Sequence, residues 1–283
     1  MTTASLPASP PRRARRRDRL LAHPLVRTVL ALFSVLVPFA LALWLSEAVP
    51  KPWPGNWPLL LAAAGIVGGY CLYVRRIEGR EVAELSPAGA WRELGSGLGL
   101  GALLVAACTA VLLAAGAYTI TGTAHAAVML KPLAEQVMVA FLEEILFRAV
   151  LFRLLEKSWG TRIALTVSTL LFVLAHLPNE HFNAFAAVMT GIAALAFAGA
   201  YLVTRRLWLP IGLHFAWNYL FDAVISVPVS GHAARGWVQV SVSGPEWLSG
   251  GGYGVEASVV TFVTWGLAAI VLLVLARRRG HWG

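Results

Sequence analysis

Long apolar segments dominate this chain and limit what it can fold into. A helix that crosses a bilayer needs ~20 mostly apolar residues. Hydrophobic residues make up 58% of the chain and charged residues only 13%, about half the charged share of an ordinary soluble protein. A soluble fold could not hide that much apolar surface, whereas lipid solvates the outer face of a helical bundle. Eight segments approach or reach the spanning length: 26–49, 57–74, 97–120, 132–155, 162–177, 184–204, 209–227 and 257–276.

These segments predict the fold class and the division of the chain. We expect an all-α, polytopic transmembrane bundle of about eight spanning helices. The segments 162–177 and 209–227 are short, so the number of spanning helices could differ from eight by one. The segment 75–94 mixes charged and apolar residues and is typical of an amphipathic helix at the membrane surface. We expect the chain to divide into a disordered basic cytoplasmic tail (1–24), three N-terminal transmembrane helices (25–130), a core that carries the motifs described below (131–228), a Gly- and Ser-rich extracytoplasmic loop to which we assign no role (229–256), and a last transmembrane helix with a basic tail (257–283).

Lysine and arginine residues gather at alternate ends of the segments. With the N-terminus inside, the inner side carries 19 of the 23 Lys and Arg residues, and the outer side carries only Lys51, Lys131 and Arg235. Because inner loops of membrane proteins are enriched in basic residues, we expect both termini in the cytoplasm. The net charge of +9 therefore orients the chain in a lipid bilayer and indicates no nucleic-acid partner. The Ala-, Leu- and Arg-rich composition favours a multi-pass protein of a bacterial plasma membrane.

Three charged residues, Glu143, Glu144 and Arg148, lie in the middle of the fourth segment. A charge inside a span costs at least ~2.5–3.5 kcal/mol on insertion scales, so such residues are usually functional or paired. Glu144 and Arg148 are four residues apart, share a helix face and are expected to pair. Glu143 is turned by about 100° from Glu144 and is free for another role. The alternative is that all three form one buried salt-bridge network.

The fifth segment places Phe172 and His176 on one helix face, four residues apart. The midpoint between Glu143 and His176 falls on the Trp159-Gly160 turn. An antiparallel hairpin of the fourth and fifth segments would thus bring Glu143 and His176 to the same depth. A lone His on an apolar helix is usually a packing residue, but this register favours a shared site.

The seventh segment carries His214 and Asn218, again four residues apart on one face. We hypothesise that the fourth, fifth and seventh segments meet at these polar residues. Asp222 lies four residues further and is an additional candidate for the polar face. Glu135 is expected in the first turn of its helix, where a carboxylate complements the helix dipole, and His232 is expected on the surface of the outer loop.

These residue types suit hydrolysis in a wet cavity. Glu143 can take a proton from water and pass it to the leaving amine, while His176 orients that water. His214 and Asn218 can donate hydrogen bonds to the oxyanion of a tetrahedral intermediate. The same Glu143, His176 and His214 could instead bind one divalent metal such as zinc, with water in the fourth position. The chain lacks an H-E-x-x-H motif, and metal-bound and metal-free variants both stay open.

Three short motifs follow one another on successive apolar segments: Glu143-Glu144-x-x-x-Arg148, Phe172-x-x-x-His176 and His214-x-x-x-Asn218. Each motif alone is common, but in this order and helical context they resemble the CPBP family. That family comprises the type II CAAX prenyl endopeptidases and bacteriocin-processing or self-immunity proteins, and is also called the Abi family. The resemblance covers about residues 135–225, with no departure inside the motifs.

The resemblance also implies roles for individual residues. Glu143 would activate water, and His176 would bind the same water or a metal. His214 and Asn218 would stabilise the oxyanion. The remaining motif residues would support these four: Glu144, Arg148 and Phe172.

The function that the resemblance implies is an intramembrane endopeptidase of metallo- or glutamate type. Its partners would be the lipid bilayer and membrane-associated peptide or protein substrates that arrive from the lipid or the cytoplasm. A non-catalytic membrane immunity or partner protein is the main alternative, because it would keep the polar cluster for structure or binding. An ion-coupled transporter also uses buried Glu and His residues, but the chain lacks a pair of Gly/Pro-broken helices in two related halves.

Overall fold

A computed structural model describes residues 23–48 and 57–282 of the chain. The predicted tail at 1–24, apart from its last two residues, lies outside the described residues, as does Lys51. The described residues are mostly helical, as the apolar segments predicted, with one small sheet.

The N-terminal half consists of helices that end in one strand. Its elements are α2 (Pro24–Ala48), α3 (Pro58–Tyr73), η1 (Val74–Glu78), η2 (Ala83–Leu85), α4 (Ala90–Ala114), β1 (Tyr118–Thr123), η3 (Ala126–Met129) and α5 (Leu130–Glu143).

The C-terminal half contains the remaining helices and the second strand. Its elements are η4 (Glu144–Phe152), α6 (Arg153–His176), α7 (Ala184–Thr204), α8 (Trp208–Tyr219), η5 (Leu220–Ile225), β2 (Val238–Val242), α9 (Glu246–Ser249), η6 (Gly251–Tyr253), η7 (Val255–Ala257) and α10 (Val259–Arg278).

Five of the described helices are long and apolar enough to cross a membrane. They are α2, α3 extended through η1 (Pro58–Glu78), α4, α7 and α10. The predicted segments 132–155, 162–177 and 209–227 are also largely helical, but they are shorter or carry more charge. The chain is therefore a membrane protein with five candidate spans, and the count of eight and the orientation of the termini stay predictions.

Two sequence predictions about local structure are wrong. The segment 75–94 is not one amphipathic helix, because Gly79 adopts a left-handed conformation (φ 66°) that ends η1, and left-handed glycines commonly terminate helices. The segment 97–120 does not stay helical to its end, since α4 stops at Ala114 and residues from Tyr118 form β1. β1 pairs antiparallel with β2, so the 229–256 segment contains regular structure.

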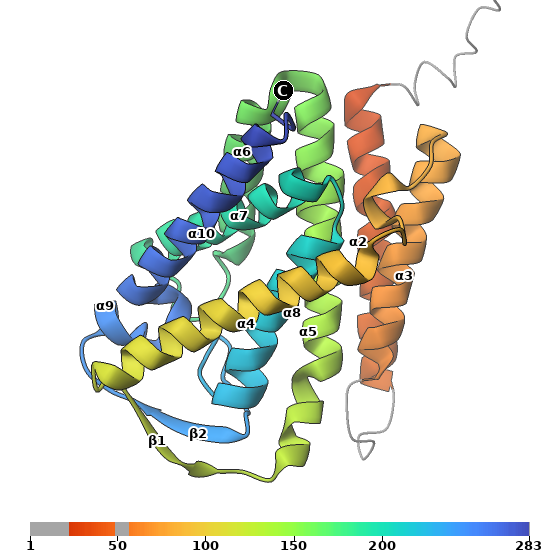
Figure 1. The fold of residues 1–283 in the computed structure, drawn as a ribbon. Helices are drawn as coiled ribbons and strands as arrows, with labels where there is room; N and C mark the ends of the chain where they lie inside the picture. Colours follow the sequence, from red (N-terminus) through yellow and green to blue (C-terminus); the bar gives the residue numbers. More distant parts are fainter. Residues whose placement is uncertain (1–22, 49–56, 283) are drawn as a thin grey trace, which may run out of the picture.

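The bundle has two ends (Figure 1), which differ in the residues that they carry. At one end, which we call the sheet end, β1 and β2 join α4, α5 and the segment that precedes α10. At the other, which we call the basic end, ion pairs tie the helix ends together: Arg153 with Glu78 (2.6 Å), Arg205 with Glu156 (2.5 Å) and Arg206 with Glu93 (2.5 Å).

The fourth and fifth predicted segments form the expected hairpin. α5, η4 and the start of α6 run as one rod toward the basic end, and the chain reverses at Gly160. Gly160 has φ 78° and ψ 169°, a backbone conformation that side-chain-bearing residues avoid. The turn predicted at Trp159-Gly160 is thus confirmed, and it returns the second half of α6 past η4.

α4 and α8 approach each other closely because their facing residues are small. A Cβ on Gly97 would collide with the carbonyl oxygen of Leu209, and a Cβ on Gly101 would lie 2.6 Å from the Cβ of Ala216. Gly212 on α8 faces the α4 backbone in the same way. Small residues four apart allow membrane helices to pack backbone to backbone, so α4 fixes the position of α8.

We predict that Gly97→Ala lowers the free energy of unfolding by about 1–3 kcal/mol, because the added methyl group overpacks this contact. Gly99→Ala on the same helix is the matched control, since no atom lies within 4 Å of its Cβ position, and its higher helix propensity is worth up to about 1 kcal/mol. Unfolding of the detergent-solubilised protein, followed by circular dichroism, measures both. Equal effects of the two substitutions would contradict the contact.

Candidate active site

The charged residues of the fourth segment lie where the helix changes type. α5 ends at Glu143, and η4, a π-helix, begins at Glu144. π-helical turns are rare and occur frequently at functional sites. Glu144 and Arg148 are buried at 0% and 2% exposure, whereas the side chain of Glu143 is 22% exposed. The two adjacent glutamates therefore have different surroundings.

Glu144 connects the fourth segment to the seventh. Its Oε1 atom accepts hydrogen bonds from Arg148 Nη1 (3.0 Å) and from His214 Nδ1 (2.8 Å). The predicted Glu144–Arg148 pair is thus present, and the contact between Glu144 and His214 is one that sequence reasoning missed. Since Glu144 engages Nδ1, the opposite nitrogen of the imidazole, Nε2, is left to face Glu143 Oε2 at 3.9 Å.

Arg148 is enclosed by aromatic rings. Its guanidinium carbon lies 4.8 Å from the ring centre of Phe172 and 4.9 Å from that of Phe197. Nη2 donates a hydrogen bond to the carbonyl oxygen of Ala194 (3.3 Å). Phe197 also stacks on His214, with ring centres 4.6 Å apart. Cation–π contacts and the Glu144 ion pair together compensate the desolvation of this buried cation.

His176 is held by its own helix turn. Its Nδ1–H donates to the carbonyl oxygen of Phe172 (2.8 Å), and the two rings lie 4.5 Å apart. With the proton on Nδ1, Nε2 carries a lone pair that can accept a hydrogen bond. The shared face predicted for Phe172 and His176 is therefore present, and Phe172 lies between His176 and Arg148.

The predicted polar residues of the three segments meet at one cavity. The cavity has a volume of about 210 Å³, and its lining includes Glu143, His176, His214 and Asn218. Glu143 Oε2 is buried and has no hydrogen-bond partner among the described residues. The side-chain amide of Asn218 likewise forms no hydrogen bond with any residue that the structure describes. Buried polar atoms normally have partners, so these groups are available to water or a ligand.

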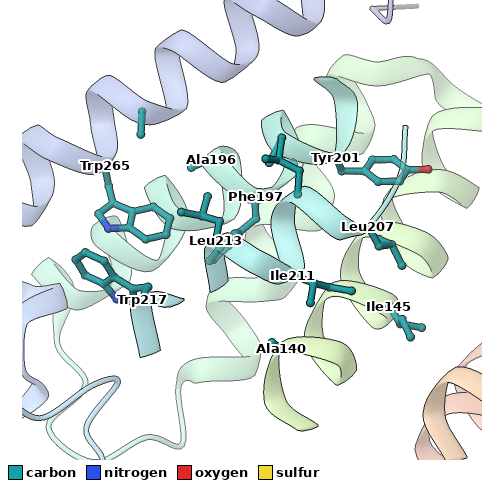
Figure 2. Close-up of a cluster of buried hydrophobic side chains, with 14 of the residues drawn as sticks. Ala140, Ile145, Ala196, Phe197, Tyr201, Leu207, Ile211, Leu213, Trp217 and Trp265 are labelled. Carbon is teal, nitrogen blue, oxygen red and sulfur yellow. The ribbon is translucent and has the colours of Figure 1, made fainter. Parts of the chain in front are cut away.

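Three aromatic side chains that line the cavity pack on one another. Trp217 and Trp265 meet edge to face with ring centres 4.9 Å apart, and Trp265 meets Phe197 at 5.1 Å. Figure 2 shows these three rings beside Leu213, the residue that precedes His214. The stacking fixes the helix that carries His214 and Asn218 against α7 and α10.

Asp222, the additional candidate for the polar face, lines the cavity, and so do several residues that were not predicted. Asp222 accepts hydrogen bonds from Gln136 Nε2 (3.1 Å) and from the backbone nitrogen of Arg235 (3.2 Å). Gln136 lies seven residues before Glu143, so helical periodicity could have identified it. Residues supplied by the 229–256 segment and by α10 carry no such signal in the sequence: Ser230, His232, Arg235, Glu256, Thr261 and Trp265.

Glu135 does not have the predicted position. α5 begins at Leu130, and its first turn contains no acidic residue, so Glu135 lies beyond the turn where it would complement the dipole. It lines the cavity instead and faces Arg235 Nη2 at 3.4 Å. His232 is exposed, as expected for the loop, but it too lines the cavity.

The three predicted metal ligands, Glu143, His176 and His214, all line the cavity. The described residues contain no group of three His, Cys, Asp or Glu side chains arranged to hold a metal ion. Each imidazole engages only Nδ1, His214 with Glu144 and His176 with the Phe172 carbonyl, and so keeps Nε2 open. Histidines that ligate zinc usually donate their other ring nitrogen to a carboxylate or carbonyl in this way, so the zinc ion stays a prediction, and the mechanism below uses the side chains of the chain alone.

The fold and the cavity define a class, a helical membrane protein with a polar cavity among its helices. Residues 125–220 match the model of a family described as type II CAAX prenyl endopeptidase Rce1-like. The match supports the resemblance of this part of the chain to the CPBP family that its motifs predicted. The match supports a protease of CAAX type. No curated protein and no solved structure matches the chain.

We predict that Arg148→Met destabilises the protein by about 3–5 kcal/mol, because it leaves the Glu144 carboxylate buried without its cation. The double variant Arg148→Met/Glu144→Gln is expected to recover part of this loss, since no unpaired charge remains. Unfolding of the single and double variants in detergent measures the coupling energy. Strictly additive losses would contradict the pairing as the source of stability.

Proposed function

We propose that the protein is an intramembrane endopeptidase that hydrolyses peptide bonds in membrane-associated peptides or proteins. The observation that carries the proposal is the unpartnered Oε2 of Glu143, which faces His214 Nε2 at 3.9 Å inside the cavity. That separation is too long for a direct hydrogen bond. It leaves the two groups free to contact the same reacting centre from opposite sides.

Charge balance supports a protonated His214. Two carboxylates, Glu143 and Glu144, lie beside one permanent cation, Arg148. A region of low dielectric disfavours uncompensated charge, and an imidazolium at His214 brings the local sum to zero. Both ring nitrogens then donate, Nδ1–H to Glu144 and Nε2–H into the cavity.

The residues of the cavity support hydrolysis by activated water. Glu143 takes one proton from a water molecule, and the lone pair of His176 Nε2 orients that water. The water oxygen bonds to the carbonyl carbon, and the resulting oxyanion accepts hydrogen bonds from His214 Nε2–H and the Asn218 amide. The C–N bond then breaks as Glu143 returns its proton to the leaving amine, giving one carboxyl and one amino product.

Glu144 and Arg148 act as positioning residues in this proposal. Glu144 keeps the His214 ring oriented through Nδ1, in the way that a buried carboxylate orients the histidine of a hydrolase triad. Arg148 holds Glu144 and is itself held by Phe172 and Phe197. The hydrogen-bond donor that they hold in place, His214 Nε2–H, contributes most where charge develops in a site of low dielectric.

We predict that Glu143→Gln reduces peptide cleavage by at least about 10²-fold, because the amide cannot accept the proton of water. The test is cleavage of a membrane-peptide library by the protein in proteoliposomes, read by mass spectrometry. Glu135→Gln is the matched control: it removes a carboxylate from the same cavity, on the same helix, and should keep activity. If the wild type cleaves nothing and Glu143→Gln changes only stability, the protein is a non-catalytic member of its family.

We predict that Asn218→Ala lowers kcat by about 10²–10³-fold with a smaller effect on KM, as loss of an oxyanion donor does. Asn179→Ala removes the same carboxamide group elsewhere in the cavity lining and serves as the control. Steady-state cleavage of any substrate found in the library separates the two parameters. A rise in KM with unchanged kcat would assign Asn218 to ground-state binding instead.

A further inference from the structure

The cavity occupies the half of the bundle nearer the sheet end. Its inner part lies at Phe197 and His214, and its outer part is lined by Ser230, His232 and Arg235 from the segment that follows η5. His232 and Arg235 are exposed, and the Arg235 side chain reaches 55%. The mouth of the cavity therefore lies among the loops of the sheet end.

The bundle is filled between the cavity and the basic end. Arg148 lies one turn beyond Glu144 toward the basic end, and it is 2% exposed between two phenylalanine rings. The next turn contributes Phe152, which packs edge to face on Tyr201 with both residues at most 2% exposed. A substrate at the basic end would have to displace this packing to reach Glu143.

The segment around the mouth is fixed to the site helix. Glu256 accepts hydrogen bonds from the Trp217 indole (3.1 Å), from the Ser230 backbone nitrogen (2.7 Å) and from the Ser230 hydroxyl (2.6 Å). The Gly231 nitrogen also donates to the Tyr253 carbonyl (2.8 Å). The rim of the cavity is thus tied to α8 beside Asn218.

The distribution of charge indicates which end faces the cytoplasm. Among the described residues, Lys131 and Arg235 are the only Lys or Arg residues of the sheet end, whereas the basic end contributes Arg residues from nearly every helix terminus. Inner loops of membrane proteins are enriched in Lys and Arg. The sheet end, with the cavity mouth, therefore faces away from the cytoplasm.

We infer that the site is reached from the extracytoplasmic side, and that its substrates are exported, membrane-anchored peptides whose cleavable segment lies at the outer membrane surface. The inference rests on the proposed function and specifies its substrate class. Of the two routes expected from the sequence, the lipid and the cytoplasm, the packed turns around Arg148 and Phe152 close the cytoplasmic one.

Cysteine labelling tests the side of access without requiring catalysis. Both native cysteines are first replaced, by Cys71→Ala and Cys108→Ala. Labelling of Ala233→Cys then measures reagent access to the mouth, and labelling of Ala193→Cys measures access to the inner lining of the cavity. Ser158→Cys is the control at the exposed turn of the basic end. Intact bacterial cells that express each variant are treated with a small, charged, membrane-impermeant methanethiosulfonate reagent.

The expected result is labelling of Ala233→Cys and Ala193→Cys in intact cells, and of Ser158→Cys only in inverted membrane vesicles. Labelling of Ala193→Cys from inverted vesicles alone, or from neither side, would overturn the inference. The same pattern is expected when Glu143→Gln is added, so the outcome is independent of whether the protein cleaves peptides. In proteoliposomes with verified orientation, cleavage should require peptide on the side where Ala233→Cys is labelled.

Discussion

The buried carboxylate of Glu144 is the contact on which the site depends. One oxygen atom binds the guanidinium of Arg148 and the imidazole of His214 at once, and so joins η4 to α8 across the core. Without it, the guanidinium of Arg148 would lose its ion-pair partner in an apolar interior, which carries a large desolvation penalty. The aromatic rings around Arg148 and His214 exclude water and strengthen the same contact. Glu143, one residue away, escapes this pairing and keeps a free oxygen in the cavity.

Helical periodicity and membrane energetics account for most of what could be predicted. The cost of charge in lipid identified Glu143, Glu144 and Arg148 as special, and spacings of four paired Phe172 with His176 on one face. The predicted hairpin turn at Trp159-Gly160 was confirmed because Gly160 adopts a backbone conformation that few other residues permit. These signals are local, so a single sequence contains them.

The parts that could not be predicted depend on contacts distant in the sequence. The hydrogen bond between Glu144 and His214 joins residues 70 positions apart. Helical periodicity does not indicate whether His214 contacts Glu143 or Glu144. The 229–256 segment reads as a Gly- and Ser-rich loop, yet β2 pairs with β1 and Glu256 anchors Ser230 beside the cavity. The end of α4 was misjudged for a related reason, since an apolar run with β-branched residues fits a strand as readily as a helix.

The glycine contact between α4 and α8 also bears on how such a protein can evolve. α4 lies outside the segment 125–220 that matches the family model, yet Gly97 sets how deeply α8 is seated, and α8 carries His214 and Asn218. Glu256 and Trp265 support the same helix from the other flank. The matched segment is therefore not an exchangeable module. The flanking helices can accept substitutions on their lipid-facing sides. Where they contact α8, a substitution must be matched by a compensating one in the segment 125–220.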